Sequence, residues 1–179
     1  MLLFTERCND AETGDAATLA GSVSLPFELR QRSRLRIEPT AGRLAGGVVG
    51  LDLPRGTILR GGDRVRCASG EVLRIDAAAE ALVHVAAGSA QALARLAYHL
   101  GNRHVPVQVG DGWLRLQADP VLEAMVTGLG ATPVRIEAPF EPEAGAYGHG
   151  GHGGHAHSHG ADGRHAPQIH DLLAERAAR

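Results

Sequence analysis

The segment 141–179 constrains the fold most, because it cannot contribute to an apolar core. The segment is rich in glycine, histidine and alanine, and its few large apolar residues follow no strand or helix period over most of its length. A segment of this composition cannot bury enough apolar surface to offset the conformational entropy lost on folding. We therefore expect a flexible tail at 141–179, behind one ordinary domain or two small ones.

Residues 1–76 combine short apolar runs with glycine-rich turn signals. Apolar residues near period 2 occur in 19–25 and 35–38, and 48–53 is also strand-like. Gly46-Gly47 and Gly61-Gly62 separate such runs. This pattern predicts a small all-β N-terminal domain over 1–76.

The pattern changes at Ala77 to alternating strand and helix. Ser89 and Asp119 each stand at the start of a segment with helical spacing, as helix-capping residues do. The expected strands cover 81–85, 105–109, 113–116 and 132–136. The resulting order βαββαβ is that of a ferredoxin-like domain, which we expect over 77–140. The fold class predicted for the whole chain is α+β.

Charge and cysteine content narrow the class of protein. The net charge is -2 with neutral histidines, and all 18 basic residues are arginine, so no basic footprint for nucleic acid is present. Cys8 and Cys67 lie far apart and form no C-x-x-C pair, which fits a reducing cytoplasm. No stretch approaches the about 18 continuous apolar residues of a membrane span, and no signal peptide is evident at the start. We expect a cytoplasmic protein with neither nucleic acid nor membrane as a partner.

Catalytic motifs are missing from the sequence. It contains no G-x-S-x-G, no H-E-x-x-H and, having no lysine, no phosphate-binding G-x-x-x-x-G-K-[ST]. Asp119 is explained as a helix cap, and a flexible linker could not hold Glu141 and Glu143 against a substrate. We expect a protein that is not an enzyme.

The histidines carry the chemistry that the sequence does offer. Glycine and other small residues separate most of the tail histidines, so a flexible chain could bring several imidazoles to one ion. Imidazole accepts zinc, copper, iron and nickel, and spacing alone does not select among them. An expression tag would be a contiguous terminal run, which this tract is not. The predicted tail ligands are His149, His152, His155, His157, His159, His165 and His170.

His104 is a separate candidate, in a loop between a helix end and a strand. One copy of the chain cannot close a metal site with this residue alone, but a two-fold dimer with His104 near its axis would supply two imidazoles. The alternative is a hydrogen-bonded loop or capping histidine. His84 and His99, which have apolar neighbours, are interpreted as structural.

Three stretches resemble the UreE family of urease accessory nickel metallochaperones. They are Tyr98–Gln108, which contains Gly-Asn-Arg-His, Asp119–Met125, and Ala138–Tyr147, which contains Pro-Phe-Glu-Pro-Glu-Ala-Gly-Ala-Tyr. Residues 25–36 and 53–57 resemble the N-terminal domain of the same family. The similarity spans nearly the whole chain.

The resemblance implies a specific function and specific partners. It implies a peptide-binding-like N-terminal domain and a dimerising metal domain that holds Ni(II) through His104 of both protomers, with Zn(II) or Cu(II) as alternative ions in vitro. The implied partners are a second copy of the chain, the urease accessory GTPase, and the urease apoprotein with its accessory complex. The histidine pair that some members carry after the hairpin is missing from 116–119.

Two other functions remain open at this point. The tail could serve nickel or zinc storage or sequestration, with the folded part as a dimerising scaffold. The β domain could instead act as an adaptor that binds an extended peptide along a strand edge.

Overall fold

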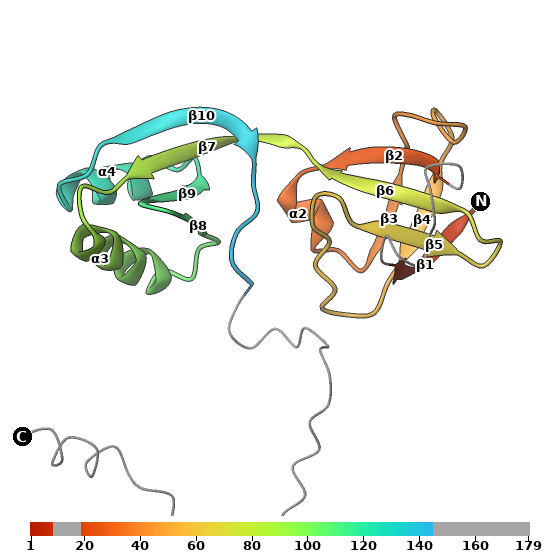
Figure 1. Cartoon of the computed structure of the whole chain (residues 1–179), viewed down its shortest axis with the longest axis horizontal. Coiled ribbons are helices and arrows are strands. Elements are labelled where there is room, and N and C mark those ends of the chain that lie inside the picture. The colour runs from red at the N-terminus through yellow and green to blue at the C-terminus, as the bar shows by residue number, and fades with distance from the viewer. Residues whose placement is uncertain (9–18, 145–179) are drawn as a thin grey trace, which may run out of the picture. The chain divides into compact units, whose positions relative to one another are not determined.

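The computed structural model describes residues 1–8 and 19–144 (Figure 1). Within them the strands form two sheets, and the fold is a mixture of α and β, as the sequence predicts. Of the predicted tail, only 141–144 lies among the described residues. None of the helices in the described ranges is long and apolar enough to cross a membrane.

The first sheet is built from the first half of the chain. Its strand order is β2-β6-β5-β1-β4-β3, with β1 parallel to β4, β2 parallel to β6 and the other neighbours antiparallel. Inward-facing aliphatic side chains and Phe4 form one continuous apolar core on this sheet. The strands are β1 (Leu3–Cys8), β2 (Leu19–Leu25), β3 (Arg34–Ile37), β4 (Val49–Asp52), β5 (Arg64–Cys67) and β6 (Val72–Ala77).

A short helix, α2 (Phe27–Arg30), interrupts the predicted all-β half. Pro26 stands at its N-cap, and the Pro26 carbonyl accepts hydrogen bonds from the backbone N–H groups of Leu29 and Arg30. Four residues are too few to show helical periodicity, so the sequence pattern carries no sign of this turn. Both Phe27 and Arg30 are buried, and their burial stabilises a helix that is too short to persist alone.

The second sheet has the order β10-β7-β9-β8 and is antiparallel throughout. Helices α3 and α4 contribute Leu96, Leu100 and Val126 to the core that they form with inward-facing residues of the sheet. The elements follow one another as β7 (Ala79–Ala86), α3 (Ala90–Gly101), β8 (Gln108–Gly110), β9 (Trp113–Gln117), α4 (Pro120–Gly128) and β10 (Pro133–Pro139). This is the βαββαβ order expected from the sequence.

Both helices of this half begin where their capping residues predict. The Ser89 hydroxyl accepts a hydrogen bond from the Ala92 N–H at 3.1 Å. The Asp119 carboxylate accepts hydrogen bonds from the N–H groups of Val121 and Leu122 at 2.8 and 3.0 Å. Asp119 is therefore a helix cap, as the sequence indicates.

Strand β8 is shorter than the predicted strand 105–109. It begins only at Gln108, because Pro106 has no N–H to donate to a neighbouring strand. The Val107 carbonyl accepts a hydrogen bond at 2.9 Å from the N–H of Glu143, which lies far from Val107 in the sequence. The segment before β8 therefore pairs with the segment after β10, a contact that no local pattern could reveal.

Two valines of the second sheet provide a matched test of this core. Val83→Ala removes a side chain with no exposed surface, whereas Val134 on β10 is 52% exposed. We expect Val83→Ala to lower the free energy of unfolding by about 2 kcal/mol, from lost transfer energy and a residual cavity. Val134→Ala should cost less than about 0.5 kcal/mol. Urea unfolding followed by the fluorescence of Trp113 measures both, and equal losses would contradict the assigned core.

Candidate metal site

The candidate site is centred on a turn that follows α3. Asn102 caps the helix, and the chain turns through Arg103 to His104, whose N–H donates to the Gly101 carbonyl at 3.0 Å. His104 is exposed. It is also the only non-glycine residue in the described ranges with a positive φ, at 54°.

The backbone conformation at His104 is unfavourable for an L-residue with a side chain. Left-handed backbone costs about 1–2 kcal/mol per residue through the contact of Cβ with the carbonyl oxygen. Glycine would avoid that cost, and the structure has glycine at its other positive-φ positions. Such strain concentrates at functional sites, so a histidine in this conformation points to a role for the imidazole.

The His104 ring makes no hydrogen bond among the described residues, and only its backbone is bonded. The alternative interpretation of the residue as a hydrogen-bonded loop or capping histidine needs such a partner. The geometry therefore favours an imidazole that is free to bind an ion.

An open groove of about 780 Å³ adjoins this turn. It lies between the end of α3 and the start of α4, next to Asn102, Arg103 and Val105, although His104 is not part of its lining. Two large apolar side chains near it are unusually accessible, with Tyr98 66% and Val121 65% exposed. The groove is lined by His99, Asn102, Arg103, Val105, Asp119, Val121, Leu122 and Met125.

The other two described histidines differ in their surroundings. Arg115 Nε lies 3.4 Å from His84 Nδ1 and donates to it, and the His84 ring lies 5.3 Å from the Trp113 ring. The environment of His84 is that of a structural residue, as the sequence suggests. His99 also touches an aromatic neighbour, Tyr98, at 5.4 Å, but it lines the groove as well. In the sequence, the signal for this position is that His99 lies only two residues before the Gly-Asn-Arg-His motif.

The seven tail histidines lie outside the described residues, so their relation to His104 is not part of the structure. Across 1–8 and 19–144, no three His, Cys, Asp or Glu side chains are grouped as metal ligands. His104 is thus the one predicted ligand whose surroundings the structure describes.

The residues just beyond β10 approach the segment that follows His104. The Glu141 N–H donates to Gln108 Oε1 at 3.2 Å, and Glu143 pairs with Val107 as described above. Pro142 between them is buried. Residues 141–143, which the sequence assigns to the tail, are thus bound by hydrogen bonds to a segment that is distant in sequence.

Comparison with known protein families assigns both halves of the chain. The family described as UreE urease accessory protein, N-terminal domain, matches residues 4–78, and the corresponding C-terminal domain family matches 80–166. The urease accessory protein UreE of Ralstonia nicotianae is 50% identical over 163 residues, which is 89% of this chain and 74% of that protein. The UreE protein of Azotobacter vinelandii is 46% identical over 175 residues, 96% of this chain and 98% of that protein.

Replacement of His104 by two different residues tests the backbone strain. His104→Gly should be about 1 kcal/mol more stable than His104→Ala, because glycine adopts a positive φ without the Cβ clash. Urea unfolding of the two variants gives the difference. A glycine variant less stable than the alanine variant would show that the turn is not strained.

Proposed function

The chain belongs to the UreE urease accessory protein family, and from this membership we propose that it delivers Ni(II) for assembly of the urease active site. The observation that carries the proposal is the exposed imidazole of His104 on a left-handed turn within Gly-Asn-Arg-His. A histidine kept in a conformation that glycine would adopt more easily is explained if its ring binds the cargo.

The proposed tight site uses His104 of two protomers. A two-fold dimer brings the same residue of each copy to the axis, so one histidine supplies two ligands. Neutral imidazole suits nickel, and it also accepts Zn(II) and Cu(II), so these ions should compete in vitro. The groove beside the turn supports the dimer, because Tyr98 and Val121 offer apolar surface that a second copy could cover.

We propose that the tail histidines act as additional nickel ligands, which bind more weakly than His104 and exchange readily. Ordering a glycine-rich chain around an ion costs about 1–2 kcal/mol per fixed residue, whereas a histidine on a folded turn avoids most of that cost. Delivery requires release as well as capture, so ligands that exchange readily suit the function. The protein itself performs no covalent step on its cargo and is proposed not to be an enzyme.

The remaining parts of the chain are proposed to serve partner recognition. We propose separate domains at 1–76 and 77–140, the second ferredoxin-like, an assignment that its βαββαβ order supports. The proposed partners are the urease apoprotein with its accessory complex and the urease accessory GTPase. Assembly of this kind is proposed to take place in the cytoplasm, with no nucleic acid or membrane involved.

Nickel or zinc storage by the tail is the main alternative, and it assigns the working site differently. Storage requires the tail histidines and treats His104 as incidental, whereas delivery requires His104. The strained backbone at His104 favours delivery, because a passive scaffold has no need of histidine at that position.

Calorimetric titration of Ni(II) separates the two kinds of ligand. His104→Ala should remove one tight site per dimer and leave the weaker ions of the tail. Truncation before His149 should remove the weaker ions and leave the tight site. His84→Ala, whose ring contacts Arg115 and Trp113, is the matched control and should leave the number of bound ions unchanged.

Urease activation at limiting nickel then assigns the working site. We expect His104→Ala to impair activation more than truncation does. If the truncated protein fails while His104→Ala activates urease normally, the tail is the working site and the delivery proposal through His104 is wrong.

Dimerisation is tested directly by light scattering at micromolar protein with Ni(II) present. The expected mass is about twice the 18.7 kDa of one chain. A mass of one chain under these conditions would contradict a site shared between two copies of His104.

A further inference from the structure

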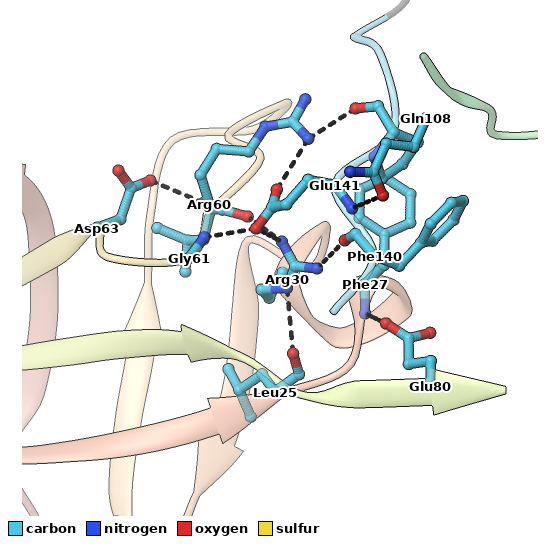
Figure 2. A network of polar contacts seen from close by, with 12 residues as sticks. Leu25, Phe27, Arg30, Arg60, Gly61, Asp63, Glu80, Gln108, Phe140 and Glu141 are labelled. Carbon is cyan, nitrogen blue, oxygen red and sulfur yellow. Dashed lines mark hydrogen bonds and ion pairs between the residues drawn. The ribbon is translucent and has the colours of Figure 1, made fainter. Parts of the chain in front are cut away.

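Arg30 is the one charged residue that is fully buried among the described residues. Its guanidinium reaches three parts of the chain (Figure 2). Nε donates to the Leu25 carbonyl and Nη1 to the Leu59 carbonyl, each at 3.1 Å. Nη2 donates to the Phe140 carbonyl, and Nη1 also meets Glu141 Oε1 at 3.0 Å.

A buried guanidinium is stable only where its donors and its charge are satisfied. Two carbonyl partners of Arg30 belong to the first sheet and its loops, and the remaining two partners are Phe140 and Glu141. The residues just past β10 are therefore required to satisfy Arg30. Apolar contact adds to this attachment, because the rings of Phe27 and Phe140 meet edge to face at 5.6 Å.

Glu141 extends the same attachment to a second arginine. Its Oε1 accepts a hydrogen bond from the Gly61 N–H at 2.7 Å, and its Oε2 lies 3.1 Å from Arg60 Nη1. Arg60 Nη1 also donates to the Pro142 carbonyl at 2.7 Å. The carboxylate is thus held by two arginines and one backbone amide, with side-chain exposure of 30% (Figure 2).

The attached segment passes directly beside the chain that follows His104. Gln108 and Val107 accept hydrogen bonds from the N–H groups of Glu141 and Glu143. Val107 is three residues from His104, and Glu143 is six residues from His149, the first tail histidine. At about 3.3–3.6 Å per residue, these stretches span at most about 11 Å and about 22 Å.

We propose that Arg30 and Glu141 are positioning residues that hold the origin of the histidine-rich tail beside the His104 turn. We call this set of contacts, Arg30, Arg60 and Gly61 with Phe140 and Glu141, the clamp. A tail anchored near the ion raises the effective concentration of its histidines at His104, and that concentration falls when the tail starts from a freely moving point. This inference rests on the proposed function, because it concerns the nickel site of His104.

The position of the tail origin is measured without metal. A nitroxide label is attached to the cysteine of an Ala146→Cys variant, which the reagent reaches selectively because the two native cysteines are buried. The label should broaden the amide NMR signals of residues 103–105. Glu141→Ala should reduce that broadening, because the side-chain attachment to Arg30, Arg60 and Gly61 is lost while the backbone hydrogen bonds to Gln108 and Val107 remain. Glu137→Ala, an exposed glutamate on β10, removes the same charge and should leave it unchanged. Broadening that is unaltered in Glu141→Ala would overturn the clamp.

A folding defect is separated from loss of the clamp by the same spectra. Amide shifts of Val83 and Leu116, in the core of the second sheet, report whether that domain is intact. If Glu141→Ala does not fold, Arg60→Ala removes only the outer contacts of the carboxylate and should reduce the broadening partially. Unaltered broadening in a folded Arg60→Ala protein would then overturn the clamp.

Nickel affinity gives the functional consequence. In the full chain, Glu141→Ala should weaken nickel binding at His104 by about five- to twentyfold. In the chain truncated before His149 the same substitution should not change nickel affinity, because the tail histidines are already absent. Equal weakening in both chains would show that Glu141 acts on the turn itself and would overturn the tail-positioning role. If Glu141→Ala reduces the broadening but leaves the nickel affinity unchanged, the clamp is upheld. The role of the tail histidines as nickel ligands in the proposed function is then contradicted.

Discussion

The buried guanidinium of Arg30 must have hydrogen-bond acceptors for its donors, and the arrangement of the surrounding chain depends on this requirement. Removing a charged group from water costs several kcal/mol unless nearly every donor finds an acceptor. No single local segment could provide those acceptors here, so the carbonyls of Leu25, Leu59 and Phe140 must converge with the Glu141 carboxylate. The short helix α2 places Arg30 where Leu25 and Leu59 meet the residues just past β10.

The His104 turn illustrates a different kind of constraint. Its conformation is set by the end of α3 and by a following stretch that Glu143 holds through Val107. A strained residue persists only where its surroundings determine it. The contacts on both sides of His104 meet that condition, and they leave the ring exposed while the backbone is fixed.

Local patterns predict most of the second half of the fold. Capping by Ser89 and Asp119 locates both helices, and alternation locates β7, β9 and β10 to within a few residues. The helix α2 and the fixed position of Glu141 escaped prediction because each depends on partners that are distant in sequence. Strand β8 is shorter than predicted for a local reason, because Pro106 has no N–H to donate to a neighbouring strand. For the candidate site, the motif around His104 predicts the residue, but its left-handed backbone and the groove that His99 lines are features that only the three-dimensional structure contains.

The strands at the two edges of the second sheet have a consequence for how this protein can associate. On one side β8 is only three residues long and is preceded by a proline, and on the other β10 carries Pro133 and Pro139 at its two ends. Short edge strands and prolines leave few backbone N–H groups in register for another strand. The sheet is therefore a poor template for open-ended stacking of copies, which would otherwise join edge to edge into fibrils. Association through side chains, which can stop at two copies, is the route that such edges leave available.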